Sequence, residues 1–351
     1  MRVANHITTA MLVFGVLGGS RAVAQTIELP DNTVEGFGAH RLENEYKLLV
    51  PDNQVAPLVA YLQKRYGRPA ILLPDSKVAL HGKFSDEFFR DVYFDTPSQQ
   101  LLHMKSGVRH RSRAIPGQPQ NRKDGRQLMQ IKLNVPGEEL TRAEVKYPIK
   151  YYTEAKTQED RHPVLGIIDR DFRPDFTAQL RQAGIDPWKL RPALTLEQRR
   201  RRMYLSDEVG PFATITVDET SSHKLWLSSK FTEVELELNE IRYSSASEAE
   251  RAEMQRVTDA IKADVLAALP GIEQDQTPKY NKAYARLAGS SSLGPLALRM
   301  SVLDMRMVGS LAGLGLFGVW MIVMLLMRRR RNRRMHPATA GQRKKELERV
   351  S

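Results

Sequence analysis

Charged and apolar side chains alternate in several short stretches of this chain, beginning with the stretch from Glu43 to Lys47. Every second side chain of a β-strand points to the same face, so Glu43, Glu45 and Lys47 would share one face. Tyr46 and Leu48 would then lie on the opposite face. The pattern predicts a strand whose charged face looks either into bulk solvent or into a polar cavity.

Further stretches repeat this alternation with rows of charge. The rows are Arg109, Arg111 and Arg113; Arg142, Glu144 and Lys146; Arg199 and Arg201; and Glu233, Glu235 and Glu237. Like charges on one strand face repel, so each row needs an opposite charge across a cavity, a bound ion or plain water. Solvent explains any single row. Several such rows in one domain, some basic and some acidic, favour a shared polar interior.

The order and spacing of these stretches resemble those of the CYTH-type triphosphate tunnel metalloenzymes, a group that includes the related VTC polyphosphate domains. Glu43, Glu45 and Lys47 match the E-x-E-x-K signature of that group. The likeness covers roughly residues 41 to 288. It continues through Val92 to Pro97, Leu101-Leu102, Gly107 to Arg111, Gln130 to Lys132, Arg142 to Glu144, Arg199 to Tyr204, Asp218-Glu219, Glu233 to Glu237 and Lys279-Tyr280.

The resemblance implies an α+β fold, in which an antiparallel β-barrel forms a triphosphate tunnel and helices pack outside it. Apolar spacing predicts a helix over residues 52–66 and another over 245–269. Short helices are expected between residues 154 and 195. Strands are expected at 84–113 as a pair, at 127–133, around Arg142, and at 196–205, 212–218, 222–228 and 231–241.

The resemblance also implies roles for the charged rows. Phosphate binding falls to Lys47, Arg109, Arg111, Lys132, Arg142, Arg199, Arg201 and Lys279, with Lys47 also the catalytic candidate. Metal binding falls to Glu43, Glu45, Glu233, Glu235 and Glu237. Within the last row, the metal pair is either Glu233 with Glu235 or Glu235 with Glu237. Guanidinium groups pair bidentately with phosphate oxygens, while carboxylates suit Mg²⁺ or Mn²⁺. Lys146 departs from the group, whose members usually carry a second acid there.

These roles predict metal-dependent hydrolysis of inorganic triphosphate, polyphosphate or an organic triphosphate inside the tunnel. Two alternatives remain open at this point: a non-catalytic module that binds or senses polyphosphate, and a VTC-like polyphosphate polymerase. An exported location would disfavour the polymerase, because ATP is scarce outside the cytoplasm. Asp95 is interpreted as a turn-forming side chain and is not counted as catalytic.

The N-terminal residues 1–24 have the features of a secretory signal peptide. Arg2 is followed by a short apolar run at 10–18, and Ala22-Val23-Ala24 fits an A-x-A cleavage site. The alternative is a short uncleaved anchor. Residues 25–40 are expected to form a loose leader.

Residues 307–327 form an uncharged, apolar segment that is long enough to cross a bilayer as one helix. Arginines follow directly from Arg328, and the positive-inside rule places this tail in the cytoplasm. We therefore expect a single-pass protein of a bacterial-type inner membrane, with an exported, periplasmic domain, a linker at 289–306 and a cytoplasmic tail at 328–351. Gly309 and Gly313 could support a homodimer, or simply reflect the usual glycine content of a membrane span.

The net charge of +12 over 351 residues is concentrated in the tail. Residues 328–351 carry ten basic and two acidic residues, which leaves only +4 for the rest. A basic block beside a membrane span is explained by topology and anionic lipids, so no nucleic-acid partner is expected. The chain has no cysteine, which excludes thiolate metal sites and cysteine nucleophiles.

Overall fold

The computed structural model describes residues 38, 41–114, 127–138 and 140–300. The predicted signal peptide, nearly all of the leader, the apolar segment 307–327 and the basic tail lie outside these residues. Within the part that is described, no helix has the length and apolar character needed to span a membrane.

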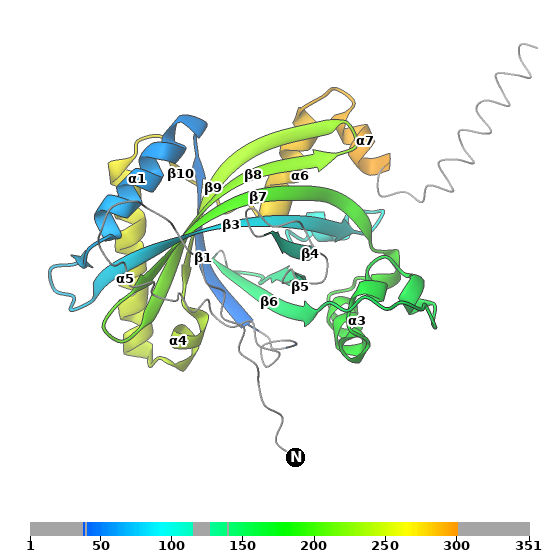
Figure 1. Cartoon of the computed structure of the whole chain (residues 1–351), viewed down its shortest axis with the longest axis horizontal. Coiled ribbons are helices and arrows are strands. Elements are labelled where there is room, and N and C mark those ends of the chain that lie inside the picture. Colours follow the sequence, from blue (N-terminus) through cyan, green and yellow to red (C-terminus); the bar gives the residue numbers. More distant parts are fainter. Residues whose placement is uncertain (1–37, 39–40, 115–126, 139, 301–351) are drawn as a thin grey trace, which may run out of the picture.

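Eight strands close into an antiparallel barrel in the order β1-β6-β5-β4-β3-β7-β8-β9, because β9 pairs with β1 (Figure 1). Short strands β2 and β10 pair with β3 and β1. The strands are β1 (Arg41–Val50), β2 (Ala70–Ile71), β3 (Ala79–Asp95), β4 (Gly107–Ala114), β5 (Gln127–Asn134), β6 (Thr141–Pro148), β7 (Arg191–Ser206), β8 (Pro211–Lys224), β9 (Leu227–Leu238) and β10 (Glu273–Gln274). The predicted α+β barrel with outer helices is confirmed.

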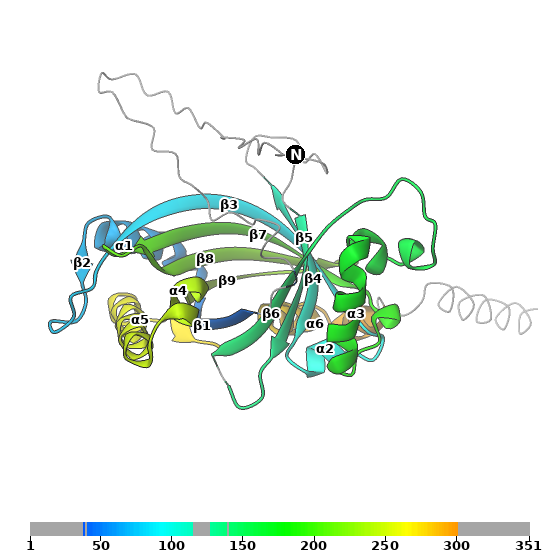
Figure 2. The ribbon, with the colours of Figure 1, turned by 90° about the horizontal axis from the view of Figure 1, so that it is seen from below.

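The helices gather at the two ends of the barrel. Figures 1 and 2 show α1, α4 and α5 at one end and α3 and α6 at the other. The helices are α1 (Val55–Tyr66), α2 (Gln100–His103), α3 (Arg173–Gln182), α4 (Glu240–Ser245), α5 (Glu248–Ala268), α6 (Lys279–Gly289) and α7 (Gly294–Met300). Short 3₁₀ helices occur at Asp52–Gln54, Glu159–Arg161, Leu165–Ile167, Arg170–Phe172 and Pro187–Lys189. The short helices expected between residues 154 and 195 are therefore present.

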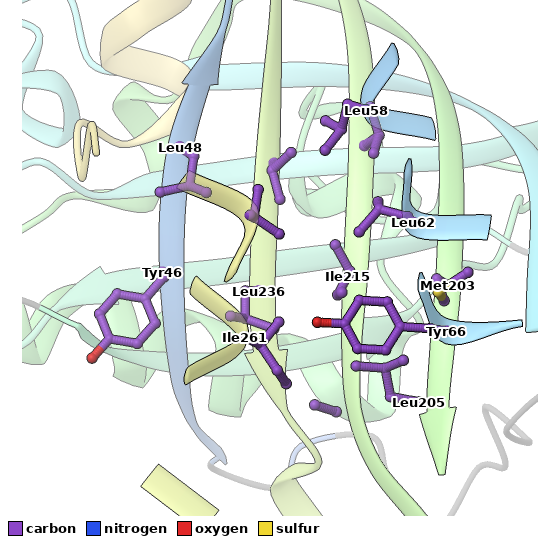
Figure 3. Packing of buried hydrophobic residues seen from close by; sticks show 14 of the residues in the cluster. Tyr46, Leu48, Leu58, Leu62, Tyr66, Met203, Leu205, Ile215, Leu236 and Ile261 are labelled. Carbon is purple, nitrogen blue, oxygen red and sulfur yellow. The ribbon is translucent and has the colours of Figure 1, made fainter. Parts of the chain in front are cut away.

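A large hydrophobic core lies between the outer face of the barrel and helices α1 and α5 (Figure 3). Helix α1 buries Leu58 and Leu62 there, as its apolar spacing predicts. Tyr46 and Leu48 of β1 pack into the same core. Burying a leucine of this kind stabilises a fold by about 1.5–3 kcal/mol. Because this core holds the apolar face of β1 outside the barrel, its charged face must point inward.

Two smaller clusters complete the packing. The first lies between the outer face of β4, β5 and β6 and helix α3, where Tyr147 packs edge-on against Phe176. The second fills one end of the barrel, where Leu194 and Leu196 of β7 meet α6 and α7. The barrel therefore has an apolar packing at its α6 end, and its charged residues lie farther along the strands.

Two parts of the chain differ from the sequence-based expectation. A separate strand at 222–228 was expected, but these residues form the end of β8, a two-residue turn and the start of β9. The apolar run of that turn, Leu225 to Leu227, caused the error because it resembles a short strand. Helix α7 lies within the segment expected to be a linker, and its Leu298 is buried in the cluster with α6.

Candidate functional site: a charged tunnel

Inward-pointing side chains of the barrel enclose a cavity of about 630 Å³. Thirteen lysine and arginine side chains line it, against seven glutamates. The basic residues are Arg41, Lys47, Lys83, Lys105, Arg109, Arg111, Arg113, Lys132, Arg142, Lys146, Arg200, Arg202 and Lys279, and the acidic ones are Glu43, Glu45, Glu87, Glu144, Glu235, Glu237 and Glu240. This excess of positive charge makes the cavity suitable for a polyanion.

One wall of the cavity is a row of arginines on β4 held in place by a buried carboxylate. Asp91 of β3 is fully buried and accepts hydrogen bonds from Nε and Nη2 of Arg111 at 2.8 and 2.7 Å. It also accepts one from Nη1 of Arg109 at 3.2 Å. Burial alone would raise the pKa of Asp91, but Arg111 and Arg109 hold it well below its usual range. Asp91 thus orients the guanidinium groups of Arg109 and Arg111. Gln130 helps to orient Arg109 by accepting a hydrogen bond from its Nε.

The opposite wall is built by β1 and β9, whose register places Glu45 beside Glu237 and Lys47 beside Glu235. Nζ of Lys47 lies 2.6 Å from Glu45 and 3.2 Å from Glu235. Burial alone would lower the pKa of Lys47, but Glu45 and Glu235 raise it, so this lysine stays charged. Burial, together with the charges of Glu43 and Glu45, raises the pKa of Glu237 to about 8.

One lysine of β5 and one of β6 also pair with acids of the cavity. Lys132 contacts Glu43 and lies 2.9 Å from Glu45. Lys146 lies 2.6 Å from Glu144, the acid on its own strand. Lys146, which stands where the family resemblance implies a second acid, therefore neutralises Glu144 instead. Arg142 also lines the cavity and donates to the main-chain oxygen of Thr141 at 2.8 Å.

Helix α6 packs on the barrel, and its lysines pair with a third group of acids, Asp218, Glu233 and Glu235. Its Tyr280 stacks on Tyr93 at 5.0 Å between ring centroids and donates to Asp95 at 2.9 Å. Asp95 also accepts main-chain N–H groups of the following turn, which agrees with its interpretation as a turn-forming side chain. The same helix carries Lys279 and Lys282 on its buried face.

Lys279 lies 2.5 Å from Asp218, 3.0 Å from Glu233 and 3.3 Å from Glu235. Burial alone would lower its pKa, but these carboxylates raise it. Lys282 lies 2.8 Å from Glu233. Glu233 is fully buried between these two lysines and does not line the cavity. Glu235 and Glu237 line the cavity with Glu43 and Glu45, whereas the carboxylate of Glu233 converges with those of Asp218 and Glu235, so the choice of metal pair on β9 stays a prediction.

The expectation that Arg199 and Arg201 line the tunnel is wrong by one residue. Arg199 lies on the outer face, 46% exposed, and pairs with Asp86. Arg201 pairs with Glu219, also on the outside. Their neighbours Arg200 and Arg202 line the cavity instead. Four consecutive arginines fit either alternation, and the outer face of β7 is fixed by Met203 and Leu205, which are buried under α1 and α5.

Sequence analysis missed several residues that hold the site together. Arg200 donates to Asp218 at 2.8 and 2.6 Å and to Glu235 at 3.1 Å. Burial would raise the pKa of Asp218, but Arg200 and Lys279 lower it to about 2. Asp91 was missed although it alternates with Tyr93 on β3, a signal that could have found it. The remaining predicted residues, Lys47, Arg109, Arg111, Lys132, Arg142, Lys279, Glu43, Glu45, Glu235 and Glu237, all line the cavity.

Comparison with known proteins agrees with this architecture. Residues 70–261 match the CYTH domain family. No sequence among curated proteins matches the chain significantly.

Solved structures similar to this chain come from archaeal, plant and fungal sources. A Pyrococcus horikoshii protein is 14% identical, with 67% of this chain and 93% of its own covered and a TM-score of 0.36. A Hippeastrum protein with a dominant triphosphatase activity is 16% identical, with 69% and 95% covered and a TM-score of 0.39. The S. pombe RNA triphosphatase Pct1 is 10% identical, with 66% and 82% covered and a TM-score of 0.31.

Proposed function

The chain belongs to the CYTH domain family, and from this premise we propose that it hydrolyses a phosphoanhydride bond of a linear triphosphate or polyphosphate, free or attached to an organic group, inside its tunnel. The observation that carries the proposal is the charge lining of the cavity, with thirteen basic side chains against seven glutamates. Such a lining attracts a chain of phosphates, and the glutamates provide a place for cations that accompany it.

The basic wall would hold the phosphate chain. Arg109 and Arg111 are oriented by Asp91, so their guanidinium planes are fixed before a ligand arrives. Preorganised donors of this kind stabilise developing negative charge without reorganisation during the reaction. Arg202 and Lys132 extend the wall on either side of the cavity. These residues would bind and orient the terminal phosphate for in-line attack by water.

Lys47, the predicted catalytic residue, is best assigned to charge neutralisation. Its ammonium group is held charged by Glu45 and Glu235, so it cannot accept a proton from water at neutral pH. It can donate hydrogen bonds to phosphate oxygens, and a cation there would stabilise the charge that develops on the leaving phosphate.

The acids of the tunnel supply the type of ligand that a divalent metal ion needs. Carboxylate oxygens converge within 4.8 Å of one another in two groups, Glu43 with Glu144 and Glu240, and Asp218 with Glu233 and Glu235. Glu43, Glu45, Glu235 and Glu237 offer only carboxylate oxygens, the donors preferred by Mg²⁺ and Mn²⁺. Burial first, and then the charges of Glu43 and Glu45, raise the pKa of Glu237 to about 8, so a cation bound at the wall of β1 and β9 would favour its ionised form. A bound Mg²⁺ or Mn²⁺ would polarise phosphate oxygens and lower the pKa of an attacking water.

A second candidate function is binding of polyphosphate without turnover. It is favoured by the protein cations that already reach the acids of the tunnel: Lys132 contacts Glu43 and Glu45, Lys146 contacts Glu144, and Lys279 contacts Glu235. A metal ion would compete with these ammonium groups for the same oxygens. If the lysines keep the metal ion from binding these carboxylates, the tunnel would still bind phosphate through its basic wall but would not hydrolyse it.

Phosphate release by the full chain distinguishes these functions. We expect release from inorganic triphosphate or short polyphosphate in the presence of Mg²⁺ or Mn²⁺, and its loss in Glu43→Gln/Glu45→Gln. The matched control is Glu197→Gln, since Glu197 is an exposed glutamate of β7 outside the tunnel. Saturable binding without release would select the binding module. If neither binding nor release occurs, the phosphate assignment is wrong.

We also propose that residues 307–327 anchor the protein in a bacterial-type inner membrane, with the tunnel domain exported and the tail in the cytoplasm. The support is the uncharged segment followed by arginines, together with the signal-like N-terminus. Retention of the full chain on vesicles after an alkaline wash tests the anchor.

A further inference from the structure

One end of the barrel exposes four large apolar side chains outside the tunnel. Leu225 and Trp226, in the turn between β8 and β9, are 62% and 66% exposed. Leu293 and Leu296, at the start of α7, are 57% and 56% exposed. These four residues are called the apolar end face. Trp and Leu side chains at this exposure lose favourable free energy in water, so a contiguous set of them indicates a contact surface.

The two halves of the apolar end face lie together in the fold. Leu227, directly after the turn, is buried in one cluster with Ala297 and Leu298 of α7. Figure 1 shows the β8–β9 turn beside α7 at the same end of the molecule. Helix α7 therefore buries one side against the barrel and leaves Leu296 on its free side.

The two segments that form this face carry charge of a single sign. The segments that form it, residues 222–231 and 279–300, contain no aspartate or glutamate. Lys230, Arg286 and Arg299 are exposed on them, while Lys279 and Lys282 are buried toward the acids of the tunnel. A surface that combines tryptophan, leucine and basic residues fits the headgroup region of an anionic bilayer, where aromatic rings and cations are both stabilised.

The turn itself does not require these side chains. Leu225 has φ of 51°, a left-handed backbone conformation that favours glycine or asparagine. A leucine in this conformation costs conformational free energy. Because its side chain is exposed, packing in the fold does not offset that cost. The apolar tip is thus better explained by a contact outside the barrel than by the turn.

The position of the remaining chain points to the same occupant. Helix α7 ends at Met300, and the uncharged segment begins at Met307. The intervening residues, even fully extended, reach at most about 25 Å. If residues 307–327 cross a bilayer, α7 and the apolar end face must lie close to that bilayer.

We propose that the apolar end face docks on the anionic bilayer that anchors the chain. This rests on the proposed anchor and not on hydrolysis in the tunnel. Strand β8 has 14 residues, so the turn at its other end lies about 45 Å away. That other end carries the cavity-lining residues Pro211 and Ile241. This mouth of the tunnel therefore faces water, away from the membrane.

The absence of cysteine from the sequence allows single-site labelling. We would label Leu225→Cys with an environment-sensitive fluorophore in the full chain, reconstituted in phosphatidylcholine vesicles with and without phosphatidylglycerol. The matched control is Val209→Cys, an exposed apolar residue (81%) in the β7–β8 turn at the opposite end. Nitroxide lipid should quench the label at position 225 several-fold more than that at 209, and phosphatidylglycerol should increase the difference.

A second variant separates docking from mere proximity. Leu296→Asp should reduce lipid quenching when it is added to the labelled Leu225→Cys chain, and should leave quenching unchanged when it is added to the labelled Val209→Cys chain. Equal and weak lipid quenching at both positions would overturn the proposal. So would a label at 225 that is protected from aqueous iodide yet not quenched by lipid, since the face would then be covered by protein, either a second copy or another partner.

Discussion

Replacing single members of the arginine run in β7 gives the sharpest test of the tunnel. Arg202 lines the cavity and donates hydrogen bonds to uncharged groups, Thr216 Oγ1 at 3.4 Å and Tyr204 OH at 3.3 Å. Arg201, its neighbour, pairs with Glu219 on the outer face. The two side chains differ by one position in sequence but lie on opposite sides of the barrel wall, so Arg202→Gln and Arg201→Gln form a matched pair.

The expected magnitudes follow from these environments. A hydrogen bond from a charged group to phosphate is worth about 1.5–3 kcal/mol, which corresponds to roughly 10- to 150-fold in binding or in kcat/KM. We expect a loss of this size for Arg202→Gln. Arg201 and Glu219 form a partly exposed ion pair, with side chains 18% and 38% exposed. Surface pairs contribute about 0–1 kcal/mol to stability, so Arg201→Gln should barely change either stability or activity. Arg200 is less suitable, because removing a buried ion-pair partner costs about 3–5 kcal/mol and could unfold the protein.

The assay is phosphate release from inorganic triphosphate by each full-length variant, with calorimetric binding of the same ligand in case turnover is absent. Circular dichroism and thermal unfolding confirm that both variants fold. A loss in Arg201→Gln equal to that in Arg202→Gln would refute the assignment of the inner and outer faces. Unchanged binding and turnover in Arg202→Gln would show that this part of the cavity holds no phosphate.

Two further predictions concern stability. Burial and the charges of Glu43 and Glu45 raise the pKa of Glu237 from 4.5 to about 8, so between these pH values the folded state keeps a proton that the unfolded state loses. The stability of the protein should therefore fall as the pH rises through this interval. Thermal unfolding of Glu237→Gln should show a shallower decline with pH, and parallel curves for the two proteins would contradict the prediction. Asp95 is buried and accepts four hydrogen bonds, one of them from Tyr280. Asp95→Ala should therefore lower the free energy of unfolding by more than about 3 kcal/mol, and Asp95→Asn by less. Unfolding in denaturant measures both, and an unchanged midpoint for Asp95→Ala would contradict the prediction.

Sequence patterns placed most of the tunnel lining correctly where the apolar side of a strand was unambiguous. In β1, Tyr46 and Leu48 share a phase and pack under α5, so Glu43, Glu45 and Lys47 had only one direction left. The same holds for β5 and β6, whose apolar phase faces the core around α3. One buried face is enough to fix the other, because a strand has only two.

Strand β7 defeated this logic because its apolar phase changes along its length. Leu194 and Leu196 point into the barrel, where they pack against α6, whereas Met203 and Leu205 point outward under α1 and α5. Both phases are apolar somewhere, and the arginine run lies between them, so alternation alone allowed either assignment. The phase could be settled only by knowing which end of the barrel a helix enters, and that depends on contacts between residues far apart in the sequence.

The acids of the tunnel show the same dependence on distant contacts. Glu233, Glu235 and Glu237 are equivalent by alternation, yet α6 brings Lys279 and Lys282 onto Glu233 and removes it from the cavity. Lys279 and Lys282 are 46 and 49 residues away from Glu233 in sequence, and neither lysine carries a local signal that it will be buried. Alternation with Tyr93 could have placed Asp91 inside the barrel, but its role depends on its pairing with Arg109 and Arg111 of the next strand. A buried charge is stable only with its partner, so the inner charges can be assigned only once the pairing of the whole barrel is known.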